Sequence, residues 1–182
     1  MYKTCVSKQA IARQRIIEYG LLDFMSHKSY EDITVIDLCE KLGIPRKAFY
    51  RYFSNKDGAL HALIDHALHD ALNQFQDAIA KFESRDEILL HFFTFWLDEK
   101  KLLDVLASND LSGILLQRAI SFTLTDETVS KYLSFLQGTQ RAKRYRTIFL
   151  ISGIMSLVIQ WHHNHFDKSP QQMAALASDL LP

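Results

Sequence analysis

The chain has 182 residues, 48% of them hydrophobic and 23% charged, a composition typical of a globular protein that buries a substantial core. It excludes a disordered or low-complexity chain and fits one domain, or a small module joined to a larger one. The net charge is zero, but residues 1–56 hold ten Lys and Arg against six Asp and Glu, which favours nucleic acid or another anion as the partner of this part.

Helix breakers are rare, since the chain has only three prolines and six glycines, and no segment alternates apolar and polar residues for long. This pattern predicts an all-α fold. The first helix is expected over residues 7–27, with Ile17, Leu21 and Phe24 as its buried stripe.

A short second helix and a third are expected next, joined by a tight turn. Thr34 and Asp37 have the spacing of a capping box that begins the second helix. Gly43 suits the left-handed residue that ends it, and Pro45 suits the opening of a third helix over residues 45–52. Two short helices joined in this way form the helix-turn-helix unit of DNA-binding domains.

The third helix is too short to be stable alone, so Phe49 and Phe53 are expected to anchor it in the core. Its other large side chains are expected to point outward: Arg46, Lys47, Tyr50 and Arg51. Taken alone, this pattern has two interpretations, a solvated helix face or a surface that meets a polyanion.

A long fourth helix is expected from Lys56, and it couples the two halves of the chain. Its buried stripe is formed by Leu60, Ile64, Leu68, Ala71, Phe75, Ile79 and Phe82. Further helices are expected over residues 85–106, 110–124, 126–137, 142–165 and 170–181.

The stretch "ITVIDLCEKLGIPRKAFYRYFSNKDGAL", residues 33–60, resembles the signature of the TetR family of bacterial transcriptional regulators. The likeness lies in the capped Thr34, the Gly43 turn, the "FYRYF" block and the "NK" that opens the fourth helix. It extends over residues 10–64. The resemblance implies a helix-turn-helix DNA-binding domain over residues 1–56 and a helical domain for effector binding and dimerisation over residues 57–182.

By position, the resemblance also implies which side chains meet double-stranded DNA. Arg46, Lys47 and Ala48 would contact base edges, Tyr50, Tyr52 and Lys56 would contact phosphates, and Thr34 would place a helix start that holds a phosphate. Two positions depart from the family pattern. Pro45 stands where a capping serine is usual, and Ala48 replaces a common threonine, so any hydroxyl contact there is lost.

The C-terminal part is similar to one subgroup of the family, the regulators of dihydroxyacetone kinase operons, some of which respond to a partner protein. Small residues on the 142–165 helix allow a second helix to approach closely, and the resemblance implies a homodimer through this helix and the last one. The candidate interface residues are Ile151, Ser152, Met155, Ser156 and Ile159.

Aromatic residues are abundant in the second domain, where residues 88–96 read "ILLHFFTFW". They either fill the core or line an apolar cavity for a small-molecule effector. The candidate lining residues are Phe75, Phe93, Trp96 and Phe122. Control by a protein co-regulator, with no cavity, is the alternative.

No residues suggest an enzyme, a cofactor or a metal site. His61, Asp65 and His69 are best interpreted as a solvated helix face, and the "HHNH" of residues 162–165 as histidines that favour a helix C-terminus. The two cysteines are too few for a disulfide framework and indicate a reducing compartment, with Cys39 an inert buried thiol. The N-terminus lacks a signal-peptide core, and residues 148–161 are too short a run to span a membrane.

These observations predict a cytoplasmic, sequence-specific DNA-binding transcriptional regulator. It is expected to be a repressor that binds a palindromic operator as a homodimer and responds to an effector in its second domain. The alternative is a regulator, an activator included, that is controlled by a protein partner docking on that domain.

Overall fold

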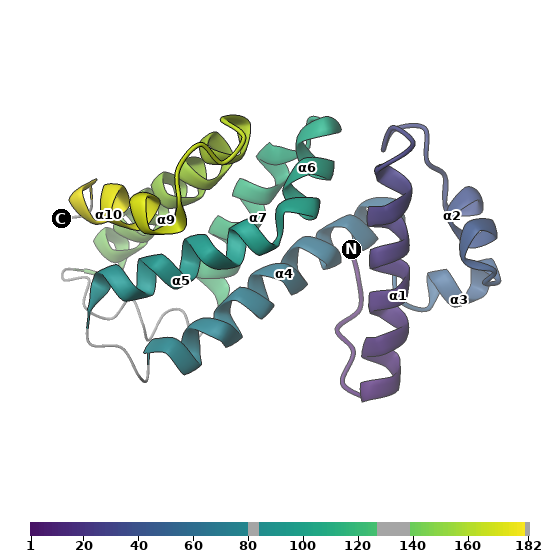
Figure 1. Cartoon of the computed structure of the whole chain (residues 1–182). Helices are drawn as coiled ribbons and strands as arrows, with labels where there is room; N and C mark the ends of the chain where they lie inside the picture. Colours follow the sequence, from purple (N-terminus) through teal and green to yellow (C-terminus); the bar gives the residue numbers. More distant parts are fainter. Residues whose placement is uncertain (80–83, 127–138, 181–182) are drawn as a thin grey trace. The chain divides into compact units, whose positions relative to one another are not determined.

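The computed structural model describes residues 1–79, 84–126 and 139–180, with the side chains of residues 75–79 outside this description. All regular secondary structure in the described residues is helical (Figure 1), which confirms the predicted all-α class. The chain divides into two compact units, Met1–Ala67 and Leu68–Pro182.

Unit 1 contains α1 (Lys8–Met25), α2 (Val35–Leu42), α3 (Arg46–Tyr50) and the first half of α4 (Lys56–Ile79). The division lies inside α4, whereas the sequence suggests a boundary at its start. Polar contacts explain the difference. The Tyr2 hydroxyl donates to the Asp65 carboxylate at 2.5 Å, and His66 pairs with Glu18 at 2.8 Å, so this half of α4 is bound to the N-terminal residues.

Local signals build the segment from α2 to α3. The Thr34 hydroxyl accepts from the Asp37 N–H and the Asp37 carboxylate accepts from the Thr34 N–H, each at 3.1 Å, so the predicted capping box is confirmed. Gly43 ends α2 with a φ of 62°, the left-handed conformation predicted for it. Pro45 occupies the N-cap position of α3, where no side chain provides a cap.

The core of unit 1 lies beneath α3. Phe49 and Phe53 are fully buried with ring centroids 5.3 Å apart, and Leu21 of α1 is fully buried as well. Phe24 is only half-buried, so its predicted place in the core is wrong. Its ring is covered by the Lys41 ammonium, which lies 4.6 Å from the ring centroid.

The first residues of the chain are bound to unit 1 by backbone hydrogen bonds. The Lys3 N–H donates to the Tyr52 carbonyl at 2.9 Å, and the Ser54 N–H donates to the Met1 carbonyl at 3.1 Å. A Cβ on Gly58 would lie 2.4 Å from the Met1 carbonyl oxygen, so the close approach of this segment requires glycine.

Unit 2 contains the rest of α4 and five further described helices: α5 (Arg85–Asp98), α6 (Lys100–Ser108), α7 (Ser112–Thr125), α9 (Gln140–His163) and α10 (Pro170–Leu180). α5 packs on α10, and α7 packs on α9. The single helix predicted over residues 85–106 is wrong, because the chain bends at Glu99, where ψ is 20°. The helix predicted over residues 126–137 falls almost wholly outside the described residues.

Candidate nucleic-acid interface

α3 presents charged and phenolic groups to solvent while its anchors are buried. Arg46 and Lys47 are exposed, Tyr50 is 49% exposed, and Ala48 is half-buried. Phe49, on the opposite side, has no exposed surface. The four aromatic side chains of residues 49–53 therefore do not act alike: two hold the helix down, and Tyr50 faces outward.

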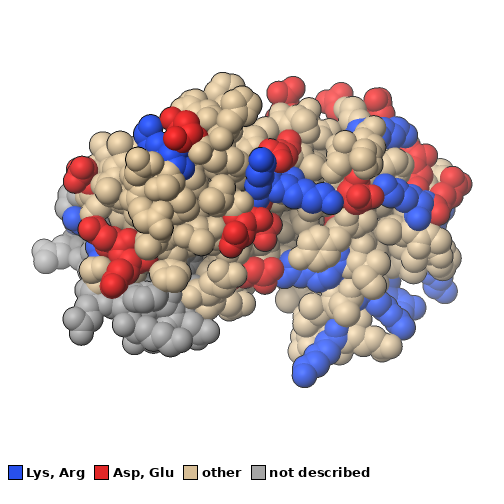
Figure 2. Space-filling model, in the orientation of Figure 1, with Lys and Arg blue, Asp and Glu red and all other residues tan. Residues whose placement is uncertain are grey.

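Positive charge gathers on one side of unit 1. Figure 2 shows Lys and Arg at the lower right, over α3 and the N-terminal part of α1, where few acidic residues are visible. Such a surface attracts a polyanion before any specific contact forms.

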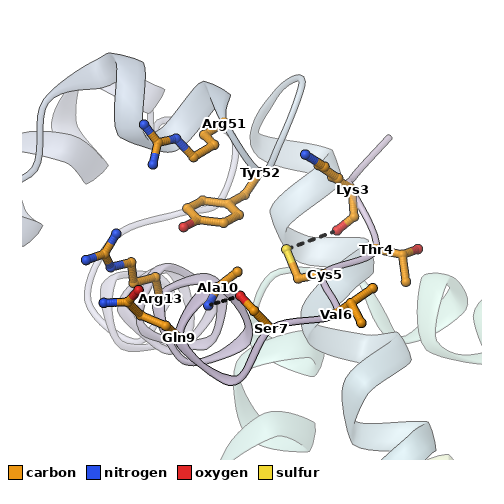
Figure 3. Close-up of a pocket in the computed structure, with 10 residues that line it drawn as sticks. All are labelled: Lys3, Thr4, Cys5, Val6, Ser7, Gln9, Ala10, Arg13, Arg51 and Tyr52. Atoms are coloured by element: carbon orange, nitrogen blue, oxygen red, sulfur yellow. Dashed lines mark hydrogen bonds between the residues drawn. The ribbon is translucent and has the colours of Figure 1, made fainter.

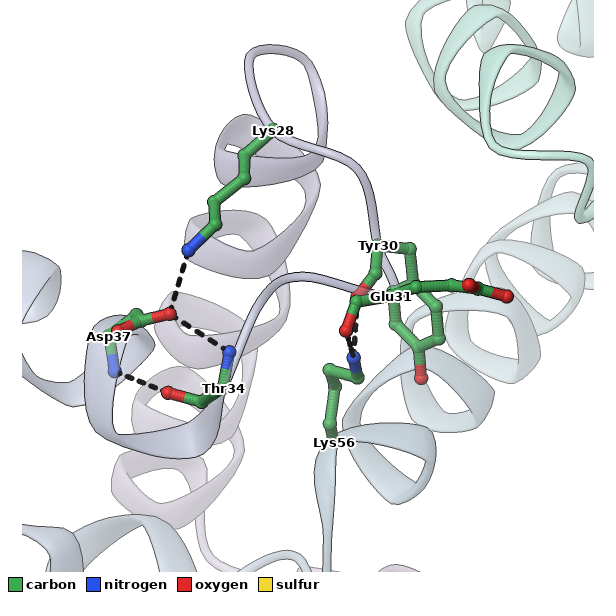
Figure 4. Close-up of polar contacts among 6 residues, drawn as sticks. All are labelled: Lys28, Tyr30, Glu31, Thr34, Asp37 and Lys56. Atoms are coloured by element: carbon green, nitrogen blue, oxygen red, sulfur yellow. Dashed lines mark hydrogen bonds and ion pairs between the residues drawn. The ribbon is translucent and has the colours of Figure 1, made fainter.

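Lys56 has a structural role as well as a position near this surface. Its ammonium donates to the carbonyls of Tyr30 and Glu31, to the latter at 3.2 Å, and lies 4.2 Å from the centroid of the Tyr30 ring (Figure 4). The Tyr30 hydroxyl donates to the Asp57 carboxylate at 2.6 Å. The pKa of Tyr30 is raised, mainly because the phenol is desolvated by burial and also because it donates to this carboxylate. Lys56 therefore fixes the loop before α2, and one of its three ammonium protons remains for a phosphate.

Thr34 is exposed and sets the start of α2, as the capping box requires. The Lys28 ammonium lies 2.9 Å from the Asp37 carboxylate, on the same oxygen that receives the Thr34 N–H (Figure 4). The hydrogen bond from Lys28 and then that from Thr34 lower the pKa of Asp37. Because folding lowers this pKa, ionised Asp37 stabilises the folded protein at any pH above the ordinary carboxyl pKa. This stabilisation is lost as the pH falls through the pKa that Asp37 has in the folded protein.

Tyr52 differs from the other candidate contacts because its side chain is buried, with 6% of its surface exposed. Its ring lies near that of Phe53, with centroids 6.3 Å apart. The hydroxyl reaches a cavity beside the N-terminal segment, where Arg51 and Arg13 also lie. The sequence pattern of α3 does not reveal this cavity, since its other walls come from residues 3–13.

The aromatic candidates of unit 2 are mostly core. Phe93 and Trp96 are fully buried, and Phe93 packs edge to face on Trp161 at 5.7 Å. Phe122 is half-buried, with its ring 4.7 Å from that of His69. The side chain of Phe75 lies outside the described residues.

The indole of Trp96 is not fully satisfied. Its Nε1–H is buried and has no hydrogen-bond partner among the residues that the structure describes. A buried donor without an acceptor costs about 1–3 kcal/mol, so a polar group that accepted from this indole would lower the free energy of the site.

The outward side of α9 differs from the predicted interface. Met155 is 2% exposed because it shares the inward stripe with Val158 and Trp161, so it is not available to a partner. Ser156 is exposed.

Among the candidates on α9, three are half-buried: Ile151, Ser152 and Ile159. Two exposed rings are absent from the predicted set, Tyr145 at 60% and Phe149 at 73%. Tyr145 and Phe149 are one helical turn apart, and Gly153 and Ser156 continue the same face of α9. This spacing can be read from the sequence and would have identified the face.

The histidine patterns have local partners. Asp65 is buried, so the predicted solvated face is wrong at this position. His162 pairs with Asp104 at 2.8 Å, near the end of α9. Across the described ranges no three His, Cys, Asp or Glu side chains are arranged to hold a metal ion. Burial raises the pKa of the Cys39 thiol, as expected for an unreactive cysteine. Among the helices of residues 1–79, 84–126 and 139–180, none combines the length and apolarity needed to cross a bilayer.

Two family models together match most of the chain. Residues 22–63 match the model of bacterial regulatory proteins of the tetR family, and residues 83–182 match that of a transcriptional regulator C-terminal region. A curated relative, the HTH-type dhaKLM operon transcriptional activator DhaS of Lactococcus lactis subsp. lactis (strain IL1403), is 28% identical over 95 residues. That match covers 52% of this chain and about half, 48%, of the relative.

Solved structures share the fold over nearly the whole chain. The fatty acid degradation regulator FadR from Bacillus halodurans has a TM-score of 0.64 at 14% identity and covers 97% of this chain and 96% of its own. A TetR transcriptional regulator from Streptococcus agalactiae 2603V has a TM-score of 0.66 at 17% identity, with 95% of each chain covered. The dihydroxyacetone kinase operon activator DhaS has a TM-score of 0.55 at 17% identity, with 93% and 94% covered.

The capped α2, the Gly43 turn and the anchored α3 thus occur in a chain whose N-terminal and C-terminal parts both match models of regulators. The protein belongs to the TetR family of bacterial regulatory proteins, and it is a DNA-binding transcriptional regulator, not an enzyme.

Proposed function

We propose that the protein binds a palindromic operator as a homodimer, with α3 of each subunit in the major groove. The observation that carries this proposal is the position of α3, whose Phe49 anchor is fully buried while Arg46 and Lys47 on the same short helix are exposed. One helix of five residues offers few base contacts, and a symmetric pair doubles them on half-sites about one helical turn apart.

The side chains of α3 divide into two roles. Arg46 and Lys47 read base edges, where each bidentate contact contributes about 1–3 kcal/mol of discrimination, and Ala48 contacts a thymine methyl. The exposed hydroxyl of Tyr50 donates a hydrogen bond to a phosphate oxygen. Lys56 holds the loop that leads to α2 and adds a phosphate contact with its remaining proton.

The proposed dimer interface is the outward side of α9, carried by Tyr145, Phe149, Ser152 and Ser156. Exposed rings on a described helix are the kind of apolar surface that a second subunit covers. On α10, Leu176 and Leu180 are also exposed and extend the apolar area that unit 2 offers.

Control by a small-molecule effector in unit 2 is the proposed mode of regulation, with repression as its result. The buried Nε1–H of Trp96, which has no partner within the described part of the chain, supports it, because a ligand with an acceptor would satisfy this donor. An effector that binds better to a dimer with wrongly spaced α3 helices shifts the population away from the operator by its differential affinity.

A second candidate, activation through a protein partner docking on unit 2, is favoured by a different observation. The curated relative at 28% identity is named an activator of the dhaKLM operon. In the core the ring of Phe93 packs on Trp161 and that of Trp96 packs on Phe95, which also suits a unit without a cavity at this position.

Selection of bound genome fragments tests the proposal, because the recovered DNA supplies an operator for quantitative binding. We expect R46A and K47A each to reduce the difference in binding free energy between operator and random DNA by about 1–3 kcal/mol. Y50F should weaken both DNAs alike. K168A, which removes an exposed cation of unit 2, is the control and should change neither.

Equal loss on both DNAs for R46A and K47A would contradict the assignment of α3 as the base-reading helix. Transcription from the recovered operator separates the two modes of control. Lower transcription with the protein alone indicates repression, and higher transcription only after a second protein is added indicates activation through a partner.

A further inference from the structure

A cavity of about 440 Å³ lies in unit 1 beside the turn that follows α3 (Figure 3). Its walls come from residues 3–7 of the N-terminal segment, from the first turns of α1, and from Arg51 and Tyr52. The backbone hydrogen bond from the Lys3 N–H to the Tyr52 carbonyl joins two of these walls, so the cavity is part of the folded structure of unit 1.

Three cations line the cavity, namely Lys3, Arg13 and Arg51, and its lining contains no Asp or Glu. All three residues are exposed, and none of their charged groups forms an ion pair or hydrogen bond within the residues that the structure describes. In Figure 3 the side chains of Arg13 and Arg51 reach toward the same side of the cavity. Three uncompensated positive charges around one hollow favour an anion there.

Tyr52 supplies a second, independent observation. It is more than nine-tenths buried, yet its hydroxyl has no hydrogen-bond partner among the described side chains and borders the cavity, between Arg13 and Arg51 in Figure 3. The hydroxyl opens into the cavity and is not sealed in the core, so it is available to donate to an acceptor that enters. The exposed amide of Gln9 lines the same wall and offers a further donor.

The donor set matches a phosphate group. Guanidinium groups bind phosphate oxygens through paired N–H donors, and a phenol or an ammonium completes such a site. The first turn of α1 contains no acidic residue, so its helix dipole adds to the attraction. The volume admits a phosphate monoester or a backbone phosphodiester with its neighbouring sugar.

We propose that this cavity is a phosphate-binding site formed by Arg13, Arg51, Tyr52 and Lys3. The phosphate comes either from the DNA backbone beside the base pairs that α3 reads or from a free phosphorylated compound. The DNA source rests on the proposed function, and the free source does not. In both cases the N-terminal segment forms part of a binding site.

Cys5 provides a direct readout, since its half-buried thiol lines the cavity while Cys39 is buried elsewhere and serves as an internal reference. Alkylation of both thiols by iodoacetamide is followed by peptide mass spectrometry, alone, with operator DNA and with inorganic pyrophosphate. We expect at least one of the two ligands to slow the reaction of Cys5 about tenfold without changing that of Cys39.

The double variant R13Q/R51Q tests whether this protection comes from the cations of the cavity. Both side chains are exposed, so the variant should fold, and circular dichroism checks that it does. If DNA is the source, operator affinity falls about tenfold and the slope of log affinity against log salt becomes shallower by about 2 per dimer, at about 0.9 per phosphate. If the source is free, the variant loses protection by pyrophosphate.

K8Q is the matched control, because it removes an exposed cation of α1 that does not line the cavity. The proposal is overturned if R13Q/R51Q behaves like K8Q in both arms, or if neither ligand protects Cys5. Protection by pyrophosphate in a protein that binds no DNA would sink the proposed function and leave the phosphate site standing.

Discussion

F49A should lower the free energy of unfolding by about 3–5 kcal/mol and abolish specific DNA binding. α3 has five residues, far fewer than an isolated helix needs, so its conformation depends on the packing of this ring. Phe49 is fully buried, with the rings of Phe53 and Tyr50 at 5.3 and 5.5 Å. Denaturant titration followed by circular dichroism and fluorescence anisotropy with labelled operator measure the two effects.

Y50A is the matched control for F49A, since Tyr50 lies in the same helix but is half exposed. We expect it to change stability by no more than about 0.5 kcal/mol and to weaken binding to all DNA alike. A protein that carries F49A and keeps both its stability and its operator affinity would show that α3 is held by something other than this ring.

F149E should convert the protein into monomers at micromolar concentration and lower operator affinity at least thirtyfold. Phe149 is 73% exposed in the single chain, and a charge at the centre of an apolar interface is costly to bury. A hot-spot residue contributes about 2 kcal/mol or more, and a twofold interface contains two copies of it. Sedimentation velocity and anisotropy with the operator measure the loss.

R144E provides the control for F149E. Arg144 is exposed on the same helix but lies about 140° around it from Phe149, at about 100° per residue. It should leave the mass in solution and the operator affinity unchanged. If F149E remains dimeric, the interface lies on another surface of unit 2.

Local chemistry allowed the helix-turn-helix segment to be predicted. A capping box and a left-handed glycine act over three or four residues, so Thr34, Asp37 and Gly43 define the ends of α2 without tertiary information. The bend at Glu99 carries no such signal, because neither Gly nor Pro stands there and the apolar pattern continues through it.

The candidate site was harder to predict where two distant segments meet. Tyr52 is buried, and the Lys3 N–H donates to its backbone carbonyl, a contact with the start of the chain that no periodicity within α3 reveals. Asp65 is also buried, and the Tyr2 hydroxyl donates to its carboxylate. Met155 is different: its spacing from Val158 and Trp161 marks the inward stripe, whereas small residues alone mark only a place of close approach.

The position of α3 on DNA is tested most directly by cleavage from a chelate attached to it. An iron chelate attached to A48C, in a C5S background, cuts the operator bases that lie near the helix, and the buried Cys39 stays unlabelled. We predict two clusters of cuts in the major groove, about one helical turn or a whole multiple apart. The account would be contradicted if the labelled protein still bound the operator but cut it no more than free chelate does, because another surface would then hold the DNA.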